Sequence, residues 1–312
     1  MSRILVTGAA GLVGQAFLDL AGAAGHELIA ADIRKPARLP DGALFRTLDV
    51  RGGDAETVIS EIKPDAVVHL ASIVSPPKGS TRDLEYAVDV TGTKNVIDAC
   101  IRHDVRRLVV TSSGAAYGYH ADNSLLLTED CPIRGNEEFA YSHHKRLVEE
   151  MLAQARVATP QLEQVVLRVG TVLGPRLDNQ ITALFKRRRL LAIAGSDSPF
   201  VFVWIDDLAR ILLRAATDGP AGIYNVAGDG SLGIDDIADR MSKKAIHIPA
   251  GLLRTVLSIA KPLGLTRYGP EQVSFLQYRP VLDNERLKSV FSYTPQKSSA
   301  QAFDAWRRSV GL

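Results

Sequence analysis

The chain has 312 residues, of which 46% are hydrophobic and 23% are charged, and its formal net charge is +2. These values are close to those of soluble globular proteins, and the length suits one large α/β unit or a core with a smaller lobe. A net charge this small argues against nucleic acids and anionic membranes as partners.

Six short runs rich in apolar and β-branched residues predict strands, at 3–7, 27–31, 44–48, 66–70, 107–111 and 164–168. Segments with helical spacing lie between most of them, for example 12–25 and 92–104. Near-continuous apolar strands separated by helices indicate a parallel sheet covered on both faces. Right-handed crossovers then give a doubly wound α/β fold of the Rossmann type, whose ligands bind at the carboxyl ends of the strands.

The alternation of strands and helices weakens after about residue 175. We therefore predict a dinucleotide-binding domain at 1–175 and a smaller C-terminal substrate-binding lobe formed by 176–200 and 230–312. Residues 201–229 again show a strand and helix pattern, and we expect them to return to the first domain.

A glycine-rich turn follows the first predicted strand in VTGAAGLVG, residues 6–14. Gly8 would allow a tight turn, Gly11 a close approach of the backbone to a pyrophosphate, and Gly14 close packing of the helix on the strand. The phosphates would meet the free N–H groups at the helix start, near Leu12 and Val13. The spacing is G-x-x-G-x-x-G rather than G-x-G-x-x-G, so a merely structural turn stays open on this motif alone.

Asp32 and Ile33 end the second predicted strand, and Asp32 lies 18 residues after Gly14. An acidic residue at this place holds the ribose hydroxyls of a bound dinucleotide and repels a 2′-phosphate. The sequence therefore predicts NAD as the cofactor, with NADP less favoured because Arg34 and Lys35 follow closely.

Two further strand ends are expected to contact the same cofactor. Asp49 and Val50 follow the third strand, where the adenine would lie. The stretch at the end of the fourth strand, which would meet the middle of the cofactor, contains Leu70, Ala71 and Ser72.

The stretch EFAYSHHKRLVEE, residues 138–150, combines Tyr141, two histidines and Lys145. Residues four apart share a helix face, so Tyr141 and Lys145 are expected to point together. A phenol is a weak acid with a reference pKa of about 10, and a nearby ammonium stabilises its phenolate form. The tyrosine then becomes a usable general base, and the lysine can also bind the nicotinamide ribose.

The stretch VVTSSGAAYG, residues 109–118, closes the fifth strand with Thr111, Ser112 and Ser113. A hydroxyl at this place would orient the substrate oxygen, and Thr111 would border the cofactor. On spacing alone, a chance Y-x-x-x-K pair on a helix remains an equal alternative to a catalytic one.

Other features point to location and surface. Cys100 and Cys131 fit neither a disulfide framework nor metal-ligand spacing, so we expect no metal site and a reducing, cytoplasmic location. The chain runs directly into a strand pattern, from which we expect no signal peptide. The basic run at 186–189 is interpreted as a solvated helix face, with a phosphate contact second. The apolar segment 251–265 is too short and too charged to span a membrane and is interpreted as a core or lid helix, with membrane-surface contact a minor alternative.

Taken together, these stretches resemble the extended short-chain dehydrogenase/reductase family, the NAD-dependent epimerase/dehydratase group. The resemblance covers nearly the whole chain and rests on TGAAGLVG, Asp32, LDV, HLAS, GTKNV, TSSGAAYG, YSHHK, LRVGTVLGP and WIDDLA, in the family's order. It implies that Ser113, Tyr141 and Lys145 are catalytic, and that Ser113 and Tyr141 also contact the substrate. It further implies a homodimer through helices at about 84–103 and 140–155, with His143 and His144 at the surface or in that interface.

Three positions depart from the family pattern. Asp89 stands where the family has an asparagine that helps to position the catalytic lysine. Thr171, the expected substrate contact, and Phe200 stand where asparagine and arginine contact a sugar nucleotide in family members. A diphosphate held without these groups would be held weakly, because phosphate recognition depends on charge-assisted hydrogen bonds.

The sequence leaves three readings of the function. The first is an NAD-dependent oxidoreductase that moves a hydride between nicotinamide and a hydroxyl or ketone of a small sugar-derived or apolar substrate. The second is a nucleotide-sugar epimerase or dehydratase with tightly bound NAD. The third, a non-catalytic dinucleotide-binding regulator, is disfavoured by the intact set of Ser113, Tyr141 and Lys145.

Overall fold

A computed structural model describes residues 1–76, 79–175, 177, 179–266 and 269–312. Its centre is a parallel sheet of seven strands in the order β10-β6-β5-β4-β1-β2-β3. The strands are β1 (Arg3–Thr7), β2 (Glu27–Asp32), β3 (Leu44–Thr47), β4 (Ala66–His69), β5 (Arg107–Ser113), β6 (Glu163–Val169) and β10 (Gly222–Val226). The sheet confirms the predicted doubly wound α/β fold of the Rossmann type.

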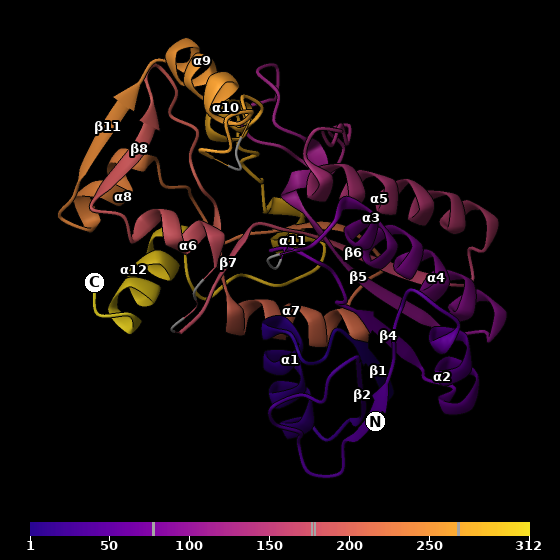
Figure 1. The fold of residues 1–312 in the computed structure, drawn as a ribbon. Helices are drawn as coiled ribbons and strands as arrows, with labels where there is room; N and C mark the ends of the chain where they lie inside the picture. The colour runs from indigo at the N-terminus through magenta and orange to yellow at the C-terminus, as the bar shows by residue number, and fades with distance from the viewer. Residues whose placement is uncertain (77–78, 176, 178, 267–268) are drawn as a thin grey trace.

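Helices cover both faces of the sheet (Figure 1). One face packs on α1 (Leu12–Ala23), α7 (Ile205–Ala216) and α11 (Glu285–Ser289), and the other on α2 (Asp54–Ile62), α4 (Gly92–Arg102) and α5 (Ala140–Ala158). The alternation of side chains along β1 divides the core: Ile4 and Val6 join the first cluster, and Leu5 joins the second. Burial of each such side chain contributes about 1.5–3 kcal/mol, so both helix layers are anchored by the same strands.

A long helix near the site is interrupted by a wider turn. The short helix α3 (Arg82–Tyr86) continues through the π-helical turn η1 (Ala87–Thr91) into α4, with Asp89 and Val90 buried inside the turn. A 3₁₀ turn, η2 (Gly114–Tyr117), follows β5 directly. Both turns lie next to α5, and π-turns are often found at functional sites.

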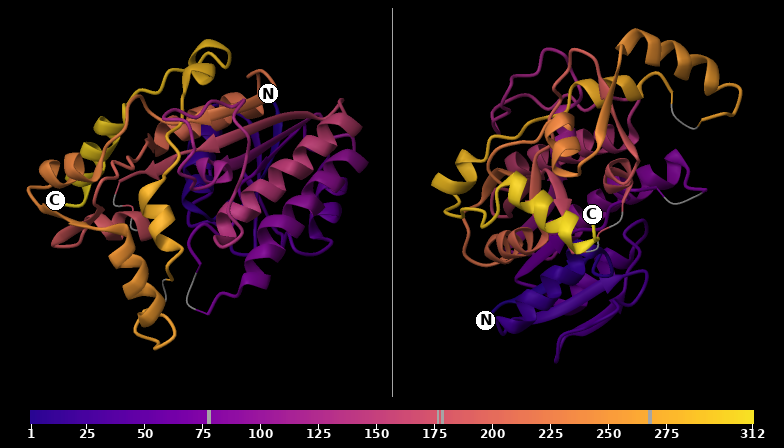
Figure 2. Two further views of the ribbon diagram at one scale, coloured as in Figure 1. Left: turned by 90° about the horizontal axis from the view of Figure 1, so that it is seen from above. Right: turned by 90° about the vertical axis from the view of Figure 1, so that its left-hand side faces the viewer.

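The remaining elements form what we call the second lobe (Figures 1 and 2). It contains α6 (Gln180–Phe185), β8 (Arg189–Ile193), α8 (Ile234–Arg240), β11 (Lys244–Ile248), α9 (Ala250–Ala260), α10 (Gln272–Gln277) and α12 (Ser299–Ser309). The short strands β7 (Thr171–Leu173) and β9 (Phe202–Trp204) pair with each other between the sheet and this lobe. An aromatic core of Phe185, Phe200, Phe202, Phe303 and Trp306 holds it together.

The chain therefore leaves the central sheet after β6 and returns to it at β10. The exact division into a domain at 1–175 with 201–229, and a lobe at 176–200 and 230–312, stays a prediction. Among the described residues, no helix combines the length and the apolar character that crossing a membrane requires.

Candidate active site

The glycine turn after β1 is built so that side chains are excluded. Gly8 has a φ of +70°, and a Cβ atom there would lie 2.5 Å from the main-chain nitrogen of Ala71. A Cβ atom on Gly14 would lie 2.4 Å from the carbonyl oxygen of Gly8. Helix α1 begins at Leu12 after Gly11, and no side chain caps its start. The N–H groups of the first helical turn, including those of Leu12 and Val13, are thus left for an external acceptor.

Asp32 at the end of β2 supports this turn directly. Its Oδ2 atom accepts a hydrogen bond from the Ala10 N–H at 3.0 Å, and its Oδ1 atom accepts one from the Arg34 N–H at 3.1 Å. The next side chain, Ile33, is exposed. A carboxylate oxygen accepts more than one hydrogen bond, so Asp32 can hold the turn and still receive hydroxyl groups of a ligand.

The two other expected cofactor segments have different surroundings. The Asp49 carboxylate forms a 2.5 Å ion pair with Arg51, whose hydrogen bonds lower the pKa of Asp49 despite partial burial. Val50 is buried beside Gly92, where a Cβ atom would lie 2.5 Å from its side chain. After β4, Leu70 donates its N–H to the Thr7 carbonyl at 3.1 Å, which holds this segment beside the glycine turn.

Tyr141 and Lys145 lie together on the first turns of α5. The Lys145 Nζ atom is 5.5 Å from the centre of the Tyr141 ring and donates a hydrogen bond of 2.9 Å to the carbonyl oxygen of Thr111. Lys145 is buried, whereas Tyr141 is half-buried and keeps contact with solvent. The lysine is therefore fixed between β5 and the tyrosine, and the phenol stays accessible to a substrate.

The two serines at the end of β5 differ in their surroundings. Ser112 is buried and donates to Glu149 at 2.5 Å, and Glu149 in turn forms a buried ion pair with Arg168. Ser113 is half-buried, and its Oγ atom accepts a hydrogen bond of 3.2 Å from the Ala115 N–H, which leaves its own proton free to be donated. Of the two, only Ser113 has a hydroxyl available for a ligand.

His144 does not lie at the surface, and this part of the sequence interpretation is wrong. His144 is buried, and its Nδ1 atom lies 3.0 Å from the Oδ2 atom of Asp89. The other carboxylate oxygen accepts hydrogen bonds of 2.9 Å from the Ser72 hydroxyl and from the Ile73 N–H. Residues three apart on a helix differ in direction by only about 60°, so His144 faces inward beside Tyr141, and the half-buried His143 faces outward.

Asp89 is a buried anion held by several donors. Burial alone would raise its pKa, but the hydrogen bond from His144, the charge of Lys145 and the bonds from Ile73 and Ser72 lower the pKa below its usual value. An ionised carboxylate can only accept hydrogen bonds, so the Nδ1 atom of His144 carries a proton. The aspartate that departs from the family pattern thus has its own partner, which sequence comparison alone did not reveal.

A model of the NAD dependent epimerase/dehydratase family matches residues 4–227. The chain belongs to this family. The predicted family, an NAD-dependent enzymatic activity and NAD as the cofactor are thereby confirmed.

Relatives of the chain include two kinds of enzyme. The chain is 28% identical over 322 residues to UDP-glucose 4-epimerase of Mycolicibacterium smegmatis, covering 96% of this chain and 95% of that protein. It is 29% identical over 224 residues to the decarboxylating sterol-4-alpha-carboxylate 3-dehydrogenase erg26 of Schizosaccharomyces pombe, covering 68% and 63% of the two chains. The structure of Thermus thermophilus UDP-glucose 4-epimerase with NAD has the same fold, with a TM-score of 0.75, 24% identity and 99% of each chain covered.

The residues of this family member fit its cofactor. The uncapped start of α1 offers N–H groups for a pyrophosphate, and Asp32 offers a carboxylate for the adenosine ribose. This turn can form only with glycine at positions 8 and 14, because a Cβ atom at either position would clash with the main chain. Leu12, Val13, Asp32 and Lys145 are therefore the residues that would hold NAD.

Beneath the turn lies a buried histidine that sequence reasoning did not single out. His69 at the end of β4 lies 2.7 Å from the Thr7 hydroxyl through Nδ1 and 3.0 Å from the Thr93 hydroxyl through Nε2. Burial, assisted by the charge of Lys145, lowers the pKa of His69 to about 3. His69 is therefore a neutral link between β1, β4 and α4, and not an acid or base of the reaction.

A cation that the sequence analysis missed lies beside Phe200, the position that the family pattern links to the substrate. Phe200 is buried and stacks on Phe202, so it offers no polar contact. The guanidinium carbon of Arg279, however, lies 3.9 Å from the centre of the Phe200 ring. Its Nη1 atom donates to the Ser198 carbonyl at 2.6 Å. Thr171 begins β7 and is half-buried, and its N–H donates to the Val201 carbonyl at 3.0 Å.

Arg279 lacks a carboxylate partner among the residues that the structure describes. Its Nε atom is buried without a hydrogen bond, and burial lowers its pKa to about 9. Aromatic rings connect it to the start of α5. Arg279 lies 5.4 Å from the centre of the Phe275 ring, Phe275 packs on Tyr119, and Tyr119 packs on Phe139, two residues before Tyr141. No local pattern around residue 279 signals this arrangement, because it depends on the tertiary packing of the second lobe.

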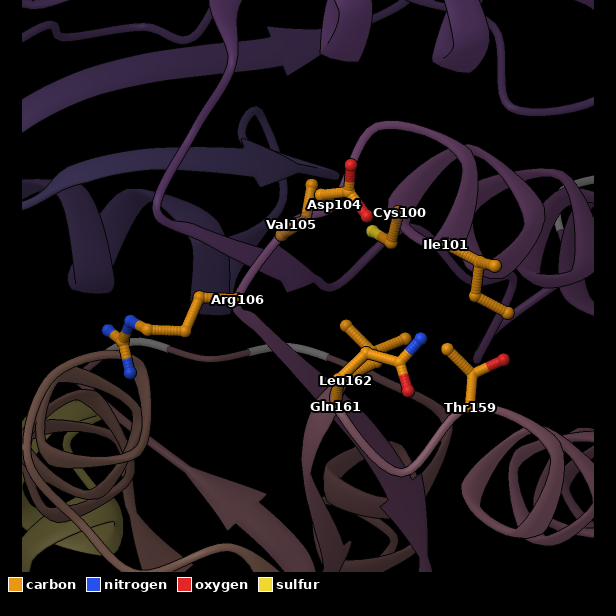
Figure 3. Close-up of a pocket in the computed structure, with 8 residues that line it drawn as sticks. All are labelled: Cys100, Ile101, Asp104, Val105, Arg106, Thr159, Gln161 and Leu162. Carbon is orange, nitrogen blue, oxygen red and sulfur yellow. The ribbon is translucent and has the colours of Figure 1, made fainter.

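A depression lies at the opposite, amino-terminal ends of strands β5 and β6 (Figure 3), away from Tyr141 and Lys145. It is lined by residues that precede β5 and β6 and by the end of α4, including Cys100, Arg106 and Leu162. Burial raises the pKa of the Cys100 thiol, which makes it a poor nucleophile. The reactive groups thus lie at the carboxyl ends of the strands, as expected for this fold.

Proposed function

We propose that the protein is an NAD-dependent oxidoreductase that transfers a hydride between nicotinamide and a hydroxyl or ketone of its substrate. The observation that carries the proposal is the pairing of accessible Tyr141 with buried Lys145, whose Nζ atom lies 5.5 Å from the phenol ring. Ser113, with a hydroxyl free to donate, ends the strand beside them.

The chain's own residues would move the proton of the reaction. Bound NAD supplies the hydride acceptor. The Lys145 ammonium would stabilise Tyr141 as its phenolate, and the phenolate oxygen would take the proton of the substrate hydroxyl as a general base and become the neutral phenol. Ser113 would donate a hydrogen bond to the reacting substrate oxygen and keep it in line with Tyr141.

We also infer that the substrate carries an anionic group. A half-buried guanidinium with no acidic partner and with a buried Nε atom that lacks a hydrogen bond carries an unfavourable desolvation cost, and an anionic ligand would offset that cost. Arg279 has this property beside Phe275 and Tyr119, which would pack against an apolar or ring-shaped part of the same molecule. A phosphate and a carboxylate both satisfy this requirement.

A nucleotide-sugar epimerase with tightly bound NAD is the second candidate. Phe200 stands in place of the arginine that contacts a phosphate in family members. Arg279, however, places a guanidinium over the Phe200 ring, and this group could bind a diphosphate instead. The basic run at 186–189 follows the end of α6 and is exposed, so it is a weaker source of this contact.

Cofactor balance separates the two candidates. The purified protein is incubated with NAD and with uridine diphosphate sugars or carboxylated alcohols, and the absorbance of reduced cofactor is followed. Net release of reduced cofactor with any of these supports the oxidoreductase. Protein that purifies with NAD and interconverts a nucleotide sugar without net reduction is an epimerase, and the first proposal then fails.

The homodimer and the cytoplasmic location expected from the sequence are part of this proposal. The helices α4 and α5 lie side by side on one face of the sheet (Figure 1) and would form the dimer contact. Sedimentation velocity of the purified protein tests the dimer: a monomer at micromolar concentration contradicts it.

A further inference from the structure

The helix α9 exposes an apolar face. Leu252, Val256 and Ile259 follow each other at helical spacing and are 57%, 50% and 58% exposed. None of the residues of α9 is fully buried. Leu263 and Leu265, in the segment after the helix, are also exposed. Side chains four and three residues apart share one side of a helix, so α9 presents an apolar stripe about 10 Å long to its surroundings.

The same region is strongly biased in charge. No aspartate or glutamate occurs between Met241 and Pro270, whereas Lys243, Lys244, Arg254 and Lys261 all lie in that stretch. Lys261 is paired with Glu271 at 3.1 Å. Lys244 and Arg254 form no ion pair in the described part of the chain. The local charge of α9 and β11 is therefore positive although the whole chain is nearly neutral.

The neighbouring strands extend this surface. In the two-stranded sheet of β8 and β11, Arg189 pairs with Lys244 and Leu191 pairs with Ile246, and all four are exposed. Arg187 and Arg188 precede β8 and are also exposed. β11 leads directly into α9, so cations and apolar side chains alternate along one continuous part of the second lobe.

The place of α9 leaves it accessible. It stands at the outer end of the second lobe in Figure 1 and projects from the body of the molecule in both views of Figure 2. Its main contact with another helix or strand is to α10, which carries Phe275, the neighbour of Arg279. A partner at α9 would therefore be next to the site without entering it.

We propose that α9 and the exposed face of β8 and β11 dock on an anionic membrane surface. A helix with a narrow apolar stripe and flanking cations binds in the interface of a bilayer by burying the stripe and attracting acidic headgroups. Each lysine or arginine near such a surface adds about 1 kcal/mol, which is about a fivefold gain in affinity. A second protein chain would need acidic side chains to meet five cations, Arg187, Arg188, Arg189, Lys244 and Arg254, and a membrane with acidic lipids supplies that charge without a matched shape.

Vesicle sedimentation tests the proposal with the full chain. The protein is mixed with vesicles of phosphatidylcholine alone or with added phosphatidylglycerol, and the bound fraction is measured at low and at physiological salt. We expect binding that requires phosphatidylglycerol and weakens with salt. Protein that remains in solution with both kinds of vesicle overturns the proposal.

Matched variants separate this surface from the rest of the molecule. Leu252→Asp with Ile259→Asp should lower the bound fraction at least about tenfold, because two acids would enter the apolar stripe. The control, Leu125→Asp with Val157→Asp, places two acids at exposed apolar residues elsewhere and should bind as the unchanged protein does. Arg187→Ala with Arg188→Ala should weaken binding about 25-fold, and Arg46→Ala with Arg308→Ala should weaken it much less.

Two further outcomes contradict the proposal. Equal losses in the α9 variant and its control would show that binding does not involve α9. A change of oligomeric state in the α9 variant, with no vesicle binding by the unchanged protein, would make this face a contact between copies of the chain. NAD binding by every variant verifies that it is folded.

Discussion

Asp89 and His144 lie 55 residues apart in the chain and meet as a buried pair, with 3.0 Å between Oδ2 and Nδ1. The ring of His144 also packs edge-on against Tyr86, at 5.6 Å between centres. This pair ties the π-helical turn to the catalytic helix one residue before Lys145. The inward face of α5 is therefore held to the turn η1 through a single aspartate.

Replacement of His144 should therefore be costly. In His144→Ala, the Asp89 carboxylate stays buried and loses a donor, and we expect the free energy of unfolding to fall by about 2 to 4 kcal/mol. The half-exposed His143→Ala should cost less than about 1 kcal/mol. Urea unfolding of both variants measures this. Adding Asp89→Asn to His144→Ala should restore part of the loss, and equal losses in the two histidine variants would contradict the assignment.

Tyr141→Phe should remove activity and retain the fold. The substitution leaves the ring and the helix unchanged but removes the phenolic oxygen that would accept the substrate proton. We expect kcat to fall about a hundredfold or more, with NAD affinity unchanged. Steady-state kinetics and calorimetry provide the two readouts, and His143→Ala is the control on the same helix. An active Tyr141→Phe protein would remove the tyrosine from the mechanism.

Asp32 should decide between the two nicotinamide cofactors. NAD is expected to bind more tightly than NADP. Asp32→Asn should reduce the ratio of the two dissociation constants about tenfold, because the negative charge facing a 2′-phosphate is lost. Asparagine retains an acceptor for the Ala10 N–H, so the glycine turn is preserved, which alanine would not achieve. Asp49→Asn is the control, since Arg51 already binds that carboxylate. Equal NAD and NADP affinities in the unchanged protein would refute this role.

Arg279→Met should weaken substrate binding without loss of stability. Removal of a charged contact raises KM for an anionic substrate about ten- to a hundredfold and leaves kcat nearly unchanged. Since Arg279 has no acidic partner among the described residues, its loss should leave the free energy of unfolding equal or higher. Arg254→Met, on the outer side of the same lobe, is the control. A large drop in stability with unchanged KM would make Arg279 a structural residue.

His69 should make the protein less stable in mild acid. Its folded pKa of about 3 lies below the usual 6.5, so between these values the unfolded chain binds a proton that the folded chain does not. Stability from this residue is complete above pH 6.5 and is lost as the pH falls, by about 1.4 kcal/mol per unit. Between about pH 6.5 and 5, the free energy of unfolding should therefore fall more steeply with decreasing pH for the unchanged protein than for His69→Gln. Parallel curves would contradict a neutral buried histidine.

The sequence predicts the sheet well because strand patterns are local. The six expected strands are found with ends shifted by no more than about two residues, and the glycine turn follows the first of them. The position of His144 was predicted wrongly because the sequence of α5 does not show which sides of the helix are covered. The turn η1 packs against α5 and buries His144. Arg279 was missed because nothing near residue 279 reveals that it will pack on Phe200, 79 positions earlier. Asp89, as a departure from the family pattern, was the one signal that a compensating partner existed.

The overall composition also does not show how charge is distributed on the second lobe. The net charge of +2 is an average over the chain, and it does not report that a stretch of 28 residues between Met241 and Pro270 has no acidic side chain. Charge that is segregated in this way acts locally, because screening limits its reach to about 10 Å. The expectation of no membrane partner therefore follows from the average and not from the surface that α9 presents.

The π-helical turn at Ala87–Thr91 makes this part of the chain sensitive to its length. A π-turn contains one residue more than an α-helical turn, so deletion of a single residue there would restore a regular helix. The helix α3 would then rotate by about 100° relative to α4. Tyr86 would leave the ring of His144, and Asp89 would leave Ser72 and Ile73. In a helix that otherwise looks regular, insertions and deletions at these five positions should be as damaging as the loss of the aspartate itself.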